Sequence, residues 1–173
     1  MIDAPSIAVI ALGIAASAID WTTRRIPNAL TFGAAAAGLA FAAATGGMHA
    51  LLLSVAGLAV GLVLFLPLFA LRAMGGGDVK LLAAFGAWLG PALVFWVAVY
   101  GAIAGGLLAL PLIVWRGRVR ATIVNLWGLV THWRVAGLKP HPVVTLDNPE
   151  AVRMPYALPI SLGALATLWL RVW

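Results

Sequence analysis

The chain has 173 residues, of which 64% are apolar and 9% are charged, and its 11 basic and 5 acidic side chains give a net charge of +6. These polar side chains are too few to cover the surface of a water-soluble domain of this length. Cysteine is absent, which excludes disulfides, thiolate zinc sites and cysteine nucleophiles. The composition predicts an all-α integral membrane protein with a single membrane domain over residues 1–173.

Apolar runs long enough to cross a bilayer recur along the chain. We expect about six transmembrane helices, at roughly 4–20, 28–45, 50–71, 79–90, 92–114 and 156–173. The fourth run is short, and only Gly90-Pro91 divides it from the fifth. Although Ala16-Ser17-Ala18 resembles a signal-peptidase site, the residues before it lack a basic region, so we expect the first run to be a retained helix.

The basic residues predict the orientation of these helices. All of them except Arg171 lie in or beside the first, third and fifth connections. By the positive-inside rule, these connections face the cytoplasm and both termini lie on the non-cytoplasmic side. The net positive charge then reflects topology and attraction to anionic lipid, and we expect no nucleic-acid partner.

The fifth connection, residues 116–155, is predicted to be a cytoplasmic loop that contains an amphipathic helix. In "RGRVRATIVNLWGLVTHWR" apolar residues recur at spacings of three and four between polar ones, a pattern typical of a helix in the membrane interface. The proline-rich "KPHPVVTLDNPEAVRMPY" that follows is expected to be irregular. This connection could contact substrate, or it could be a tether that rests on lipid.

Two acidic residues lie at the ends of predicted membrane helices. Asp20 closes the first helix and Asp78 opens the fourth, and the expected topology puts both at the cytoplasmic boundary. Ionisable residues at such positions are functional candidates because burying them is costly. Each could be an ordinary helix-end charge, but together they suggest an aspartic dyad, in which one carboxylate activates water and the other acts as acid. The three histidines are scattered, and we expect neither a metal nor a cofactor.

The residues around the aspartates fit this hypothesis. Three glycines, Gly75, Gly76 and Gly77, precede Asp78, and we expect them to adopt backbone angles closed to other residues and to expose bare backbone to an extended substrate. They could equally form a simple hinge. Pro27 is expected to break the helix after Asp20, with Asn28 capping the next one.

Both motifs resemble those of the type IV prepilin peptidases. "DWTTRRIPN", which begins at Asp20, has the aspartate six residues before Ile-Pro-Asn, and "GGGDVKLLA", which begins at Gly75, has the Gly-x-Gly-Asp motif followed by Lys-Leu-Leu-Ala. "RMPYALPISLGAL" also looks like the last span of that family. The resemblance covers nearly the whole chain.

The resemblance implies an aspartic endopeptidase of the bacterial inner membrane, with Asp20 and Asp78 as its catalytic pair. Such enzymes remove the short basic leader of prepilins or pseudopilins at the cytoplasmic face. By motif position, the Gly75–Gly77 backbone and Lys80 would border the substrate, although Lys80 could also be a boundary residue that reaches toward water. The large members carry an extra Cys-x-x-Cys domain associated with N-methylation. This chain instead resembles the short, peptidase-only members that serve tight-adherence (Flp-type) pili, so we predict no methyltransferase activity.

Two other interpretations are open at this stage. Presenilin and signal peptide peptidase share Gly-x-Gly-Asp, but they lack the Ile-Pro-Asn context. Alternatively, the protein could be a non-enzymatic transporter or assembly subunit that uses Asp20 and Asp78 as a proton or cation site. Transport sites usually lie near the bilayer midplane, whereas both aspartates are predicted at one edge.

Overall fold

The computed structural model describes residues 3–137, 139–140, 145 and 154–170. This part of the chain forms α1 (Ala4–Thr23), α2 (Asn28–Ala70), α3 (Gly76–Trp115), α4 (Val119–Ala136) and α5 (Ala157–Leu170), without strands. Among these, α1, α2 and α3 are long and apolar enough to cross a membrane, and α5 is a shorter apolar helix. The expected all-α class is confirmed for these residues. Most of the predicted irregular loop, and the last residues of the sixth apolar run, lie outside them.

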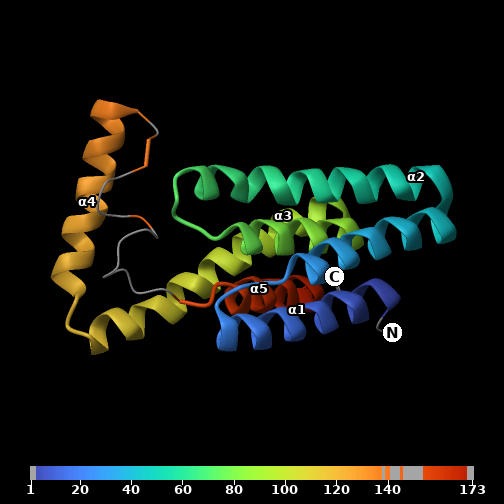
Figure 1. Cartoon of the computed structure of the whole chain (residues 1–173), viewed down its shortest axis with the longest axis horizontal. Coiled ribbons are helices and arrows are strands. Elements are labelled where there is room, and N and C mark those ends of the chain that lie inside the picture. The colour runs from blue at the N-terminus through green and yellow to red at the C-terminus, as the bar shows by residue number, and fades with distance from the viewer. Residues whose placement is uncertain (1–2, 138, 141–144, 146–153, 171–173) are drawn as a thin grey trace.

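Both long helices, α2 and α3, fold back on themselves at a glycine. Gly47 has φ 60° and ψ −152°, and Gly90 has φ 79° and ψ 176°. Such positive φ values are readily adopted only by glycine. Figure 1 shows the chain reversing direction within α2 and again within α3. The predicted breaks near residues 45–50 and at Gly90-Pro91 are therefore observed, while the number of membrane crossings stays a prediction.

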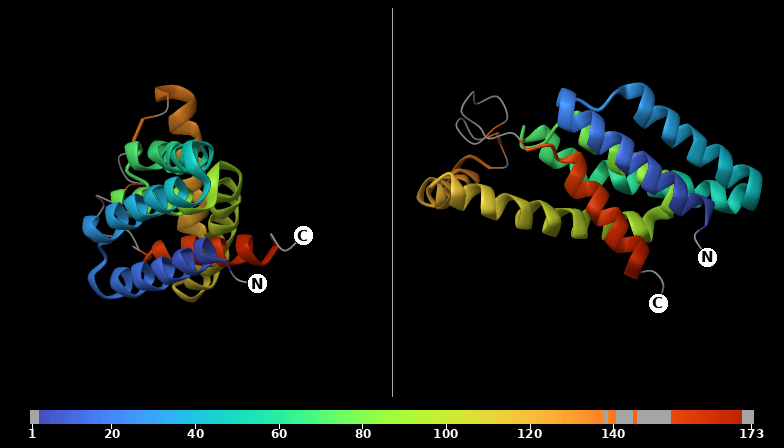
Figure 2. Two further views of the ribbon diagram at one scale, coloured as in Figure 1. Left: turned by 90° about the vertical axis from the view of Figure 1, so that its right-hand side faces the viewer. Right: turned by 90° about the horizontal axis from the view of Figure 1, so that it is seen from below.

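The reversals bring the helix ends that carry Asp20 and Asp78 to one end of the bundle. α1 ends, and α3 and α5 begin, at the same end of the bundle, whereas the start of α1 and the end of α5 lie toward the opposite end (Figures 1 and 2). α4 runs across this bundle instead of along it (Figure 1). Exposed apolar side chains on α4 include Ile123, Leu126 and Trp127. A helix is thus present within residues 116–155, and its position in the membrane interface remains a prediction.

The first limb of α3, residues 76–89, is the centre of the core. Leu81, Leu82 and Phe85 on it are fully buried. α3 packs against α2 and against α5, and α1 packs against α5. This short limb is thus held by neighbours on several sides, and Asp78 is part of its first turn.

Glycines allow the second limb of α2 to approach the first limb of α3 closely. A Cβ atom built on Gly57 would lie 2.1 Å from the carbonyl oxygen of Gly86, and one built on Gly61 would lie 2.7 Å from that of Leu82. The spacing of Gly57 and Gly61 is the small-xxx-small pattern that permits close contact of apolar helices. Here the pattern joins two limbs of one chain, and the contact fixes the position of the helix that carries Asp78.

Candidate active site

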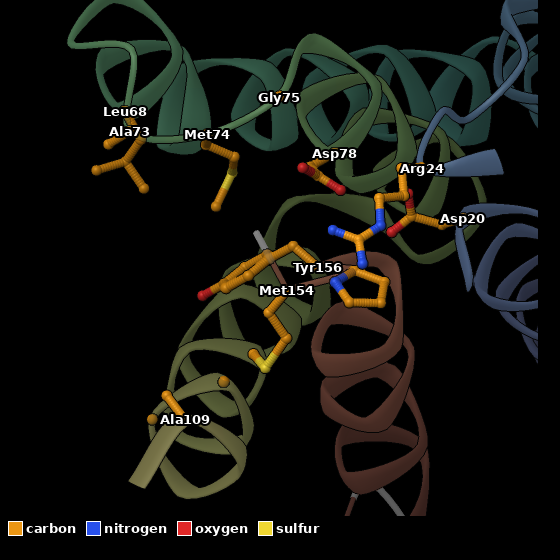
Figure 3. Close-up of a pocket in the computed structure, with 13 residues that line it drawn as sticks. Asp20, Arg24, Leu68, Ala73, Met74, Gly75, Asp78, Ala109, Met154 and Tyr156 are labelled. Carbon is orange, nitrogen blue, oxygen red and sulfur yellow. The ribbon is translucent and has the colours of Figure 1, made fainter. Parts of the chain in front are cut away.

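A cavity of about 540 Å³ opens where α1 ends and α3 and α5 begin. Both predicted catalytic residues line it (Figure 3). Its lining residues are Asp20, Arg24, Leu68, Ala73, Met74, Gly75, Asp78, Gly105, Gly106, Ala109, Met154, Pro155 and Tyr156. The fold therefore brings together two carboxylates that lie on different helices and far apart in the sequence.

Asp20 is held rigidly near the end of α1. Its side chain is buried, and its Oδ2 atom accepts a hydrogen bond of 3.3 Å from the backbone N–H of Ala157, the first residue of α5. A helix N-terminus stabilises a carboxylate through its unpaired N–H groups and its dipole. The Ser17 hydroxyl donates to Ser161 Oγ at 3.0 Å, which further joins α1 to α5 below the cavity. One contact of Asp20 and one of Ser17 thus join the end of α1 to α5.

Asp78 lies in the first turn of α3, and its side chain is partly exposed to the cavity. Its backbone N–H donates to the carbonyl of Gly75, the N-cap residue, at 3.2 Å. The residues that follow Asp78 on α3 are buried, so the helix that carries this carboxylate is packed against its neighbours. Figure 3 shows Asp78 and Asp20 on the same side of the cavity.

The glycines before Asp78 do not play the conformational role that the sequence suggested. None of Gly75, Gly76 and Gly77 has a positive φ, and the last two already belong to α3. A Cβ atom on Gly77 would lie 3.1 Å from the side chain of Ile26, and one on Gly76 would lie 3.3 Å from the ring of Phe69. The expectation of unusual backbone angles was wrong, because these glycines permit close packing instead. Gly75 lines the cavity, whereas Gly76 and Gly77 are not among its lining residues.

Lys80 joins the two sequence motifs to each other. Its Nζ donates a hydrogen bond of 2.8 Å to Oδ1 of Asn28 and lies 5.3 Å from the ring centroid of Phe32. The prediction that Asn28 caps α2 was wrong: Pro27 is the N-cap residue, without a side-chain cap, and the Asn28 side chain binds Lys80 instead. Lys80 does not line the cavity, and its predicted contact with substrate stays a prediction.

Arg24 is the lining residue whose importance the sequence did not reveal. It caps α1 in the left-handed conformation, with φ 54° and ψ 30°, and its backbone N–H donates to the carbonyl of Asp20 at 2.9 Å. This conformation costs a residue other than glycine about 1 kcal/mol. The sequence analysis grouped Arg24 with Arg25 as a topology signal, and no sequence pattern separates them. In the structure, only Arg24 of this pair lines the cavity.

Tyr156, immediately before α5, forms part of the opposite wall. Its ring contacts that of Phe65 edge-on, with centroids 6.4 Å apart. The sequence signal for it was the segment "RMPYALPI", which the family resemblance had already drawn attention to.

The cavity has the parts for acid–base chemistry on a peptide. Two carboxylates face a space large enough for a chain segment, and most of the remaining lining is apolar or glycine. No three His, Asp or Glu residues of the described chain gather in a group that could hold a metal ion. The arrangement suits direct activation of water by a pair of aspartates.

Comparison with known proteins agrees with this geometry. A family model described as "Type IV leader peptidase family" matches residues 7–110, which contain both aspartates. Two curated proteins named "Prepilin leader peptidase/N-methyltransferase", from Burkholderia pseudomallei strains 1026b and K96243, are each 39% identical to the chain over 114 residues. The match covers 62% of this chain and 36% of each relative, so the chain spans little more than a third of the relatives' length. No solved structure matches the chain.

Proposed function

This chain belongs to the type IV leader peptidase family, and on that premise we propose that it is a membrane-embedded aspartic endopeptidase that removes the leader peptide of Flp-type prepilins at the cytoplasmic face. The main observation behind the proposal is that Asp20 and Asp78 line the same cavity. The names of the two relatives support a prepilin substrate. Pseudopilins, which have the same kind of leader, are a second substrate class.

The proposed reaction uses the two carboxylates in complementary roles. One takes a proton from a water molecule as the water oxygen attacks the carbonyl carbon of the scissile peptide bond. The other gives its proton to the carbonyl oxygen, and a tetrahedral intermediate forms. When the C–N bond breaks, the departing amine takes a proton from the dyad, and a hydroxyl of the intermediate returns one to it as the C=O bond re-forms. The pair then again holds one shared proton.

The proposed topology has six crossings, with both termini on the non-cytoplasmic side of the inner membrane. A continuous helix of 43 residues, the length of α2, would extend for about 65 Å, which is roughly twice the hydrocarbon thickness. The reversals at Gly47 and Gly90 let α2 and α3 each cross twice. In this topology, the cytoplasmic side contains the described basic residues of the first, third and fifth connections, among them Arg24, Arg72 and Arg116.

The position of the dyad also bears on the alternative of a proton or cation site. Asp20 is near the last turn of α1, and Asp78 is in the first turn of α3. Sites that serve alternating access are usually near the membrane midplane. Placement at helix ends favours chemistry on a segment that arrives from the cytoplasm.

Cleavage of a prepilin in membranes tests the proposal. We would co-express the chain with a Flp-type prepilin and follow the size of the pilin by electrophoresis and the new N-terminus by mass spectrometry. We expect complete loss of the leader. If several Flp-type prepilins remain intact while the chain is present at normal membrane levels, the peptidase assignment is wrong.

We further predict that the chain lacks pilin N-methyltransferase activity. The connection between α1 and α2 comprises only residues 24–27, and the chain has no cysteine with which to build the paired Cys-x-x-Cys motifs of the large family members. Mature pilin produced by this chain alone should have an unmodified N-terminal amine in the mass spectrum. A mass increase of one methyl group that requires this chain would contradict the prediction.

A further inference from the structure

Arg24 combines a strained backbone with a side chain that points into the cavity (Figure 3). We propose that its guanidinium binds a main-chain carbonyl of the substrate next to the scissile bond, and so holds the peptide in position for the aspartates. This inference rests on the proposed peptidase function and assigns to it a residue outside the dyad. Arg24 is thereby a substrate-binding residue and not only a topology signal.

The first reason is the shortage of hydrogen-bond donors in the cavity. Of the described residues that line it, only Arg24 and Tyr156 have side-chain N–H or O–H donors besides the dyad's shared proton. A peptide that enters this apolar space loses the water bound to its carbonyl groups, and an unpaired carbonyl is costly there. Figure 3 shows the Tyr156 hydroxyl directed away from the two carboxylates. Arg24 already has an interaction within the protein, but its guanidinium has five donors, so it is also placed to bind a carbonyl beside the dyad.

The second reason is the backbone of Arg24. The position after a helix that takes the left-handed conformation is usually occupied by glycine, which adopts it without strain. Here the position has a large, charged side chain at φ 54° instead. Strained residues cluster at functional sites, and of the two arginines with this backbone, Arg24 and Arg72, only Arg24 lines the cavity. Both Arg24 and Arg25 have exposed side chains, but only Arg24 lines the cavity.

The chain supplies two matched controls. Arg25 is the adjacent arginine, with the same charge and, like Arg24, an exposed side chain. Arg72 has the same left-handed backbone, with φ 56°, but does not line the cavity. Substitutions at Arg25 and at Arg72 therefore separate the effects of charge and of backbone strain from that of the Arg24 side chain.

The test measures catalysis and binding separately on the full-length protein in detergent micelles. With a Flp-type prepilin as substrate, kcat and KM are determined for Arg24→Gln, Arg24→Lys, Arg25→Gln and Arg72→Gln. The same substitutions are then made in an Asp78→Asn background, where the Kd of the fluorescently labelled prepilin is measured without turnover. Melting temperatures of Arg24→Gln and Arg24→Gly report whether the fold is intact.

We expect Arg24→Gln to raise both KM and Kd by about 10- to 100-fold, the loss typical of a hydrogen bond to a charged group. Its kcat should change by less than about threefold, and Arg24→Lys should give intermediate values because it keeps the charge but not the planar fork. Both control variants should stay within about twofold of the unmutated protein. Arg24→Gly should melt no lower than the unmutated protein, because it relieves strain, yet bind as weakly as Arg24→Gln.

If the unmutated protein cleaves prepilin, either of two results would overturn the inference about Arg24. One is a KM and a Kd for Arg24→Gln that match those of Arg25→Gln. The other is a fall in kcat and in melting temperature with unchanged Kd, which would make Arg24 a structural counter-charge for the dyad. If the unmutated protein cuts no Flp-type prepilin, the proposed function fails and the inference fails with it, a result distinct from both.

Discussion

Asp20→Asn and Asp78→Asn should each lower the rate of prepilin cleavage by at least about a hundredfold, the scale expected when a general acid or base is removed. An amide can neither take the proton from water nor give one to the carbonyl oxygen, although it fills nearly the same space. Because the two groups act as one unit, the double variant should be no slower than the slower single variant. The rates are measured in membranes with a Flp-type prepilin at matched protein levels.

Asp3→Asn is the control for this pair. Asp3 is the N-cap residue of α1, where it accepts the N–H of Ser6 at 3.1 Å, and it is not a lining residue of the cavity. Asparagine caps a helix as well as aspartate does, so cleavage should proceed at nearly the unmutated rate. Should Asp20→Asn or Asp78→Asn also cut at that rate, the two-aspartate mechanism would be untenable.

Gly86→Ala should destabilise the protein by about 3 kcal/mol or more, at the upper end for an overpacked core. The added Cβ would lie 2.1 Å from the carbonyl oxygen of Gly57, a backbone atom that cannot rotate away. The two limbs would have to move apart, and Asp78, on the same helix as Gly86, would move with them. We expect a lower melting temperature in detergent micelles and slower cleavage.

The same substitution at Gly33 should have the opposite effect. Gly33 lies within α2, and a Cβ there would have no neighbour within 4 Å. Gly33→Ala should therefore stabilise the protein by about 0.5–1 kcal/mol through the higher helix propensity of alanine. If Gly86→Ala melted within a degree of Gly33→Ala, the close contact between α2 and α3 would not exist in the membrane.

The helices were predictable from sequence because apolar runs and glycine breaks are local signals. Glycine tolerates positive φ, so the glycines at 47 and 90 mark the places where the helices break. The spacing of apolar residues indicates the helix at residues 119–136. The start of α3 was predicted three residues too late. Glycines normally weaken a helix, but Gly76 and Gly77 are helical here because tertiary packing against Phe69 and Ile26 outweighs propensity.

The candidate site was only partly predictable. Asp20 and Asp78 stand out because acids are rare in apolar helices. Arg24 could not be distinguished from Arg25, since the backbone angle that aims it into the cavity depends on how α1 ends. The hydrogen bond between Asp20 and Ala157 joins residues 137 positions apart, and no local pattern predicts such a pairing.

The depth at which α3 reverses has a consequence for the lipid around the protein. Gly90, where α3 reverses, lies beside Leu53 and Gly57 of α2. Leu53 is six residues, or about 9 Å of helix, from Gly47, where α2 reverses. Figure 1 accordingly shows α3 turning back before α2 does. In the proposed topology, the reversal at Gly90 would lie short of the membrane surface, a hydrophobic mismatch that is met by local thinning of the bilayer at a fraction of a kcal/mol for each ångström. The stability of the protein would then depend on the acyl-chain length of its membrane, through the lipid beyond this reversal, on the side opposite the aspartates.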